Sequence, residues 1–240
     1  MSVLILRLAG PLQSWGAASR FNRRATEPFP TKSGIVGLLA AAQGRRRADE
    51  IEDLLGLELA VRTDQRGQPL RDFHTAHHPV SGAAMPLTER FYWSDAVFTA
   101  YVGGPDPVLE GLDEALRDPR YPLYLGRRSC VPEGRMVLGR HEGDVATAVR
   151  ETPWAAGFSG RRKAAREVSV RLPVQADVSV FAGEQPSREI NDVPLSFDPH
   201  HRQYRSRMVV ETHVVVPTGN KIPSEGVAEH DPMALLGGAS

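Results

Sequence analysis

The chain has 240 residues, 41% of them hydrophobic, so it can bury the core of one large or two small domains. Its 29 basic and 29 acidic residues give no net charge, and overall charge therefore does not mark it as a nucleic-acid-binding protein. One cysteine, Cys130, excludes an internal disulfide and a cysteine-rich zinc site.

The first predicted element is a strand buried on both faces, because residues 3–8 form a nearly continuous apolar run that ends at Gly10. The loop after it carries Gln13, Ser14 and Trp15. Two hydrogen-bonding side chains beside a flat aromatic ring can contact a ligand, and the flanking glycines permit close approach of the backbone. Trp15 can instead cap the core while Gln13 and Ser14 cap a turn, and both interpretations stay open on these residues alone.

The next predicted element is a helix over residues 33–43, and Ser33 can cap its N-terminus. Its apolar side chains fall on one face: Ile35, Leu38, Leu39 and Ala42. Thr31, Lys32 and Ser33 then stand where free N–H groups and the helix dipole favour an anion such as an RNA phosphate. Ordinary capping explains the same three residues equally well.

Arginine dominates the basic residues, with 26 of the 29. Its planar fork binds phosphates and bases and stacks on aromatic rings, which suits RNA, although a GC-rich genome gives the same bias. Clustering along the chain is more informative. The clusters are Arg20, Arg23 and Arg24; Arg45–Arg47; Arg127 and Arg128; Arg161–Lys163; and Arg202, Arg205 and Arg207. Arg45–Arg47 follow the C-terminus of the predicted helix, which favours either a helix-dipole role or a partner contact.

A long excursion over residues 62–85 interrupts the regular pattern after a short helix at 48–55 and a strand at 57–61. An insertion of more than about 20 residues in a compact domain is usually functional or disordered. Three elements follow it: a strand at 91–102, a helix at 105–117 and a strand at 121–125. The resulting order, strand-helix-strand-strand-helix-strand, is that of ferredoxin-like and RNA-recognition folds, but the aromatic motif of the latter is missing from the predicted strands.

The remainder of the chain is predicted to be strand-rich, at residues 135–140, 167–174, 178–181 and 208–216. We expect an α+β domain over residues 1–134 with an insertion at about 62–88, and a smaller β-rich domain or sheet extension over 135–216. Gly, Pro, Ser and Ala dominate residues 217–240, which predicts a mobile tail. With no apolar run near the ~20 residues of a membrane span and no basic leader, we expect a cytoplasmic protein with no membrane partner.

Three histidines of the excursion, His74, His77 and His78, are candidates for chemistry. Neighbouring residues of a strand point to opposite faces, and Asp72 is the one nearby carboxylate, so we expect no metal site. Histidine can also act on a 2′-hydroxyl while a cation stabilises the phosphorane, which leaves metal-independent RNA cleavage as an alternative. No lysine accompanies these histidines and no nucleotide-binding or nucleophile motif occurs, so we expect a non-catalytic protein without cofactors.

Five spaced segments resemble, in order, the fifth family of CRISPR-associated (Cas) proteins of the RAMP superfamily, in its type I-E form. They are SVLILRLAGPLQSWG at residues 2–16, FPTKSGIVGLL at 29–39, DFHTA at 72–76, ERFY at 89–92 and YPLYLGRRSC at 121–130. Several motifs in one order are more specific than any single motif. The resemblance covers roughly the first 135 residues, and the rest is similar mainly in length and strand-rich character.

This resemblance implies a ferredoxin-like (RRM-like) N-terminal domain whose excursion is a thumb folded over guide RNA. It implies a non-catalytic subunit of Cascade, an antiviral ribonucleoprotein, that holds the 5′ handle of the CRISPR RNA and caps the complex backbone. The implied partners are CRISPR RNA, the repeating backbone subunit and the large subunit, with target DNA reached through the complex. We expect RNA contacts at Gln13, Ser14, Trp15, Lys32, Ser33, Arg71, His74, Arg127 and Arg128.

Two alternatives accompany this interpretation. Some relatives in other CRISPR subtypes cut precursor guide RNA with a Tyr, Lys and His set, whereas the type I-E systems use a separate endoribonuclease. An endoribonuclease of the same fold is therefore the first alternative. A purely structural assembly subunit is the second.

Overall fold

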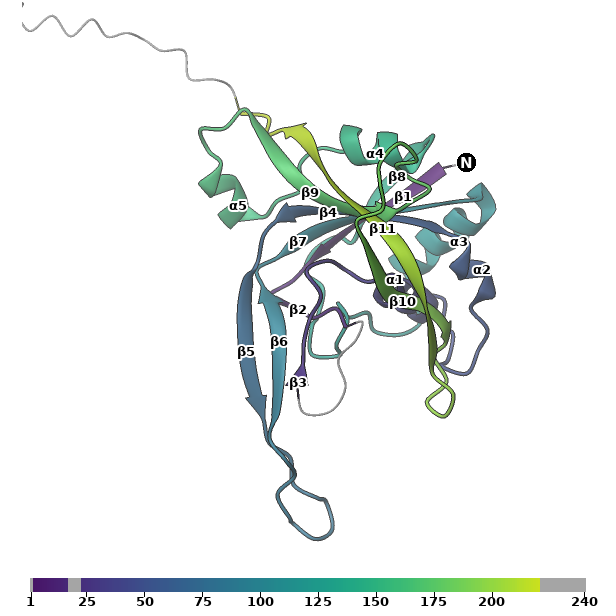
Figure 1. Ribbon diagram of the computed structural model, residues 1–240, viewed down its shortest axis with the longest axis vertical. Helices are drawn as coiled ribbons and strands as arrows, with labels where there is room; N and C mark the ends of the chain where they lie inside the picture. Colours follow the sequence, from purple (N-terminus) through teal and green to yellow (C-terminus); the bar gives the residue numbers. More distant parts are fainter. Residues whose placement is uncertain (1, 17–22, 221–240) are drawn as a thin grey trace, which may run out of the picture.

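The computed structural model describes residues 2–16 and 23–220 (Figure 1). Arg20 and residues 221–240 of the expected tail lie outside this part. One sheet of seven strands has the order β10-β11-β9-β4-β7-β1-β8, and every neighbouring pair is antiparallel. Its strands are β1 (Ser2–Ala9), β4 (Glu58–Gln65), β7 (Val97–Gly104), β8 (Val137–Glu142), β9 (Ser169–Asp177), β10 (Arg188–Ser196) and β11 (Gln203–Pro217).

Strand β1 lies between β7 and β8 and is buried on both faces, as its apolar run predicts. Because side chains of a strand alternate, Leu4 and Leu6 join one hydrophobic cluster, while Val3 and Ile5 join another. Helices α1 (Lys32–Ala42) and α3 (Asp106–Arg117) pack into the first cluster, and α4 (Val145–Glu151) packs into the second. The loop that follows β1 is thus held by a fully packed strand.

Helix α1 begins one residue earlier than predicted, because Thr31 rather than Ser33 is its cap. The Thr31 hydroxyl accepts the backbone N–H of Gly34 at 3.2 Å. At the other end the chain leaves the helix through Gly44, whose φ of 79° a residue with a Cβ rarely adopts. The short helix α2 (Glu52–Leu55) follows and covers only the second half of its predicted range.

A second, smaller sheet forms around a hairpin that projects from the body of the molecule (Figure 1). Its strands are β2 (Leu12–Gln13), β3 (Arg23–Arg24), β5 (Gln68–His74) and β6 (Thr88–Ser94). Strands β5 and β6 make the hairpin and lie within the predicted excursion and just beyond it. The single strand predicted at 91–102 is instead split between β6 and β7 at Asp95, whose φ of 54° turns the chain from one sheet into the other.

Residues 121–125, predicted as a strand, form a loop, and the strand that follows α3 is β8. Hydrogen bonds within this loop and to the loop after β1 explain this. Leu125 donates its N–H to the carbonyl of Cys130 at 2.7 Å and accepts the N–H of Ser14 at 3.1 Å. Elsewhere, residues 178–181 form a turn, and β10, α4 and α5 (Phe158–Lys163) are elements that the sequence pattern did not predict.

Strands β9, β10 and β11 extend the main sheet, because β9 pairs with β4. A boundary at residue 134 does not coincide with a break in the sheet, since β8 follows it and pairs with β1. Residues 135–216 therefore continue the sheet that begins in the N-terminal half. No helix in the described ranges is long and apolar enough to cross a membrane.

Both outer strands of the main sheet are irregular. The register of β10 against β11 shifts between Asn191 and Val193 and again between Pro194 and Ser196. The register of β8 against β1 shifts at the step from Ile5 to Leu6 of β1. Such bulges bend a strand and disturb its ladder.

Candidate nucleic-acid interface

A cleft of about 970 Å³ lies between α1, the loop at residues 121–131 and the tip of the β10–β11 hairpin. Seven arginines line it: Arg24, Arg45, Arg46, Arg47, Arg127, Arg128 and Arg202. No Asp or Glu is among its lining residues within the described part of the chain. Aromatic side chains share the walls: Tyr121, Tyr124, Phe197 and Tyr204. Cations for phosphates and rings for bases are the groups that single-stranded nucleic acid needs.

The fold brings together arginine clusters that are far apart in sequence. Arg24 comes from β3, Arg45–Arg47 from the turn after α1, Arg127 and Arg128 from the loop after α3, and Arg202 from the β10–β11 hairpin. The clusters are visible in the sequence, but their convergence is not. The remaining cluster, Arg161–Lys163, lies at the end of α5 and does not line the cleft.

The arginines of the cleft differ in how far they are neutralised. Arg45 forms a two-armed hydrogen bond with Asp53, 2.5 Å on each arm, which raises the pKa of Arg45 and lowers that of Asp53. Arg46 makes only a weak ion pair, because its side chain is 81% exposed and its Nε lies as far as 3.9 Å from Asp49 Oδ1. Within the described residues the other five have no ion pair, and four of these five are also exposed: Arg24, Arg47, Arg128 and Arg202. These are the cations most available to an anionic ligand.

Arg127 serves the wall as well as the cleft. Its guanidinium lies 4.7 Å from the centre of the Tyr92 ring and donates to the carbonyl of Arg24 at 2.8 Å. Its other terminal nitrogen, Nη1, is buried and has no hydrogen-bond partner among the described residues. Arg128 beside it is exposed. Of the pair predicted to bind RNA, Arg127 orders the loop, and Arg128 is the more accessible charge.

The loop after β1 is part of the core. The side chains of Gln13 and Trp15 are 0% exposed. Gln13 Nε2 donates to the carbonyls of Leu8 at 3.0 Å and Ala96 at 2.8 Å, and Trp15 Nε1 donates to Gln13 Oε1 at 3.2 Å. Ser14 is also buried, and its hydroxyl donates to the backbone carbonyl of Phe91. Burial of these side chains matches the core-cap interpretation. Ser14 and Trp15 nevertheless border the cleft, and RNA contact by these three residues stays a prediction.

Two glycines explain how this loop packs so closely. A Cβ at Gly34 would lie 2.8 Å from the Trp15 ring, so α1 touches the indole directly. A Cβ at Gly126, whose φ is 85°, would lie 1.8 Å from the carbonyl oxygen of Ser14. The segments at residues 2–16, 29–39 and 121–130, which carry the sequence resemblance, are therefore one packed unit, and each contributes residues to the lining of the cleft.

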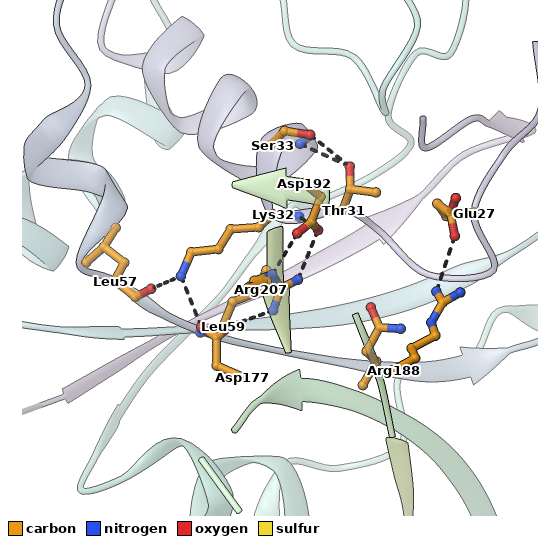
Figure 2. Close-up of polar contacts among 12 residues, drawn as sticks. Glu27, Thr31, Lys32, Ser33, Leu57, Leu59, Asp177, Arg188, Asp192 and Arg207 are labelled. Atoms are coloured by element: carbon orange, nitrogen blue, oxygen red, sulfur yellow. Dashed lines mark hydrogen bonds and ion pairs between the residues drawn. The ribbon is translucent and has the colours of Figure 1, made fainter. Parts of the chain in front are cut away.

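Lys32 is an internal ion-pair residue. Its Nζ donates to the carbonyl of Leu57 at 2.8 Å and to Asp177 Oδ2 at 3.1 Å, as Figure 2 shows. Its backbone N–H, the first of α1, donates to Asp192 Oδ2 at 2.7 Å. Carboxylates of the chain itself thus occupy the place where a phosphate was expected, and the expected RNA contact of Lys32 is not supported. Ser33 does line the cleft.

Arg71 and His74 lie on the β5–β6 hairpin and do not line the cleft. Arg71 donates to Glu89 at 2.6 Å and lies 4.6 Å from the centre of the Phe73 ring, while His74 is hydrogen-bonded to Asp72. The predicted site residues therefore divide between a cleft and a separate hairpin. Within the described ranges, no group of three or more His, Cys, Asp or Glu side chains is arranged to hold a metal ion.

The chain is similar to known proteins of CRISPR systems. Residues 3–210 match the family model described as CRISPR-associated protein (Cas_Cas5). The CRISPR system Cascade subunit CasD of Escherichia coli (strain K12) is 37% identical over 159 residues, which are 58% of this chain and 70% of that protein. A chain of a CRISPR RNA-guided surveillance complex is 34% identical, with a TM-score of 0.73 over 90% of this chain and 91% of that one. A further crystal structure of a Cas protein is 34% identical, with a TM-score of 0.69 over 92% and 100%.

Proposed function

Because the chain belongs to the Cas5 family of CRISPR-associated proteins, we propose that it is a Cascade subunit that holds the 5′ handle of the CRISPR RNA in the arginine-lined cleft. The observation that carries the proposal is the lining itself. Seven arginines face a cleft without a carboxylate in its described walls, although the whole chain has no net charge. A local field of one sign on a neutral protein attracts a phosphate chain to one place.

Different side chains of the cleft suit the phosphates and the bases of the RNA. Arg46, Arg47, Arg128 and Arg202 supply charges for phosphates. Tyr204, which lines the cleft from β11, is 36% exposed and presents a ring on which a base can stack, an interaction worth ~1–3 kcal/mol per base. A bent single strand, rather than a duplex, fits such a mixture, since its bases are free to leave the stack.

The architecture fits this role. We infer that β1, β4, β7 and β8 with α1 and α3 form a ferredoxin-like unit, since they follow one another as strand-helix-strand-strand-helix-strand and lie in the antiparallel order β4-β7-β1-β8. The β5–β6 hairpin is then the thumb. It exposes apolar side chains that suit contact with a neighbouring subunit of the complex: Leu70, Phe73, Val80, Met85 and Leu87.

The proposed role is non-catalytic. Precursor cleavage would need a general base held against the 2′-hydroxyl, and no histidine of the described residues lines the cleft. His74, which is hydrogen-bonded to Asp72, lies on the hairpin. Incubation of the purified protein with precursor repeat RNA in EDTA should leave the RNA intact. A specific cut that disappears in a His74→Ala variant would replace this proposal with the endoribonuclease alternative.

Salt-dependent RNA binding tests where the strand lies. Each phosphate contact to a single strand contributes about 0.7 to the slope of log affinity against log salt concentration. Arg128→Ala and Arg202→Ala should each lower that slope by about 0.7 for a synthetic RNA with the repeat-derived 5′ end. Arg171→Ala is the matched control, because Arg171 is exposed on β9 and does not line the cleft.

Two results would contradict the proposal. Equal losses in Arg128→Ala, Arg202→Ala and Arg171→Ala would show diffuse attraction of a polyanion. Failure of the parent protein to retain the RNA better than a scrambled RNA of the same composition would favour the purely structural subunit.

A further inference from the structure

Four charged side chains meet where the start of α1 touches the C-terminal strands. Lys32, Asp177, Asp192 and Arg207 form this group, called the charge cluster below (Figure 2). The side chain of Asp192 is fully buried, and the other three are 10–15% exposed. Two carboxylates and two cations leave the cluster neutral, so it adds no net charge to the cleft nearby.

Arg207 is the hub of the cluster. Its Nε and Nη2 donate to the two oxygens of Asp192 at 2.7 and 3.0 Å, and its Nη1 donates to Asp177. Burial opposes the charge of Arg207, but the hydrogen bonds and attraction of Asp192 and Asp177 outweigh burial and raise its pKa above the ordinary value. The fork is therefore held charged and in one orientation.

Asp192 joins the fork to α1. Its Oδ2 accepts both Arg207 Nη2 and the backbone N–H of Lys32, the first residue of the helix. Asp177 makes a parallel connection, because it accepts Lys32 Nζ as well as Arg207. Strands β9, β10 and β11 each contribute one member, so three strands and one helix are tied at a single point.

The two elements tied in this way both line the cleft. Helix α1 contributes Ser33 and Gly37, and the tip of the β10–β11 hairpin contributes Phe197, Arg202 and Tyr204. A Cβ at Gly37 would lie 3.6 Å from the Phe197 ring, so the walls also touch directly. Arg207 is on β11, the strand that starts at the hairpin tip, only three residues after Tyr204. The cluster lies between the body of the protein and the part of the hairpin that faces the cleft.

A buried ion-pair cluster is a poor source of stability, because desolvation of the charges offsets most of their attraction. Its stronger effect is to fix one geometry. We propose that Arg207 is a positioning residue for RNA: by holding Asp192 and Asp177 together, it fixes the β10–β11 hairpin against α1 and so sets where Arg202 and Tyr204 lie relative to the other residues that line the cleft. This inference rests on the proposed function of the cleft, but its geometric part is measurable without RNA.

The test compares Arg207→Gln and Asp192→Asn with a matched control. Asp64→Asn is that control, since Asp64 is paired with Arg62 in a fully buried ion pair on β4, away from the cleft. All three variants lose a buried ion pair, and RNA affinity is measured at a temperature where each is folded. We expect Arg207→Gln and Asp192→Asn to weaken binding roughly tenfold and Asp64→Asn to leave the affinity of the folded protein unchanged.

Two further readouts separate positioning from direct contact. The salt slope should stay at the parent value in Arg207→Gln, whereas Arg202→Ala lowers it by about 0.7, because only the latter removes a phosphate contact. Arg207→Lys, which keeps the charge but not the fork, should restore part of the affinity. Should Arg207→Gln fail to fold, Asp192→Asn still tests the proposal, since the Asn carbonyl can replace Oδ2 and accept the Lys32 N–H, while the negative charge and the acceptor for Arg207 Nε are lost.

Limited trypsin digestion provides the measurement that does not depend on RNA. Faster cleavage after Arg202 and Arg205 at the hairpin is expected in Asp192→Asn and not in Asp64→Asn. Equal cleavage in the two, or equal RNA affinity in the two, overturns the positioning role. Failure of the parent protein to bind RNA overturns the proposed function instead. The digestion result then still decides whether the charge cluster fixes the hairpin.

Discussion

Truncation of Trp15 to Ala should destabilise the protein severely, and the structure gives the magnitude. The indole is fully buried, and loss of a buried Trp or Phe side chain costs about 3–5 kcal/mol. Gln13 Oε1 also loses its donor, Trp15 Nε1, which adds ~1 kcal/mol or more for a buried acceptor left without a partner. At about 2–4 °C per kcal/mol for a protein of this size, the melting temperature should fall by roughly 8–24 °C.

A second substitution sharpens this prediction, because the indole lies against Gly34. In the parent protein Gly34→Ala should destabilise, since its Cβ would lie 2.8 Å from the ring. In the Trp15→Ala background the same methyl group fills part of the new cavity and removes a helix glycine, so it should stabilise. Thermal and urea unfolding of the four proteins measure this change of sign.

The opposite outcome would refute the reasoning. A Trp15→Ala variant that melts within a few degrees of the parent but loses RNA affinity would show that the ring is an exposed platform for a base. RNA binding that follows the folded fraction would show that the ring is part of the core.

Three further predictions each concern one local feature of the structure. Gly126→Ala should cost about 2–5 kcal/mol in urea unfolding, because its φ of 85° is unfavourable for Ala and its Cβ would meet the Ser14 carbonyl. The N–H of Thr147 lowers the pKa of Asp144. The stabilisation of α4 by the Asp144 cap is therefore complete above the ordinary pKa of Asp and is lost as pH falls through the lowered value. The melting temperature of Asp144→Asn should match that of the parent at pH 7 and should fall less between pH 5 and 2. Replacing residues 75–87 by a tight turn should leave the melting temperature within a few degrees, since every one of them is exposed, and should impair co-purification with partner subunits.

Local patterns predicted the elements whose partners are also local or whose periodicity is strong. The apolar run of β1 and the amphipathic faces of α1 and α3 each appear within two residues of their predicted bounds. Residues 121–125 have the composition of a strand, but the partners of Leu125 are the loops at Ser14 and Cys130. No local pattern indicates that choice, because it depends in part on Ser14, which is far away in the chain.

The candidate site was predictable only in its composition. Lys32 was expected to face RNA, but it binds Asp177 and Asp192, which are 145 and 160 residues away in sequence. The exposed arginines Arg46 and Arg202 became site residues only because folding brings their loops to one cleft. Runs of basic residues in a sequence indicate which residues can bind a phosphate, whereas the direction of each side chain is a property of the tertiary structure.

The irregular outer strands of the main sheet have a consequence for how the protein associates with others. A long, regular edge offers unpaired N–H and C=O groups to any other strand, including that of a second copy, and so invites aggregation. Pro194 and two register shifts in β10, and a further shift in β8, interrupt both edges. The main sheet therefore offers no long, regular edge on which another strand could add, and we expect contacts with other proteins to use side chains and projecting loops instead.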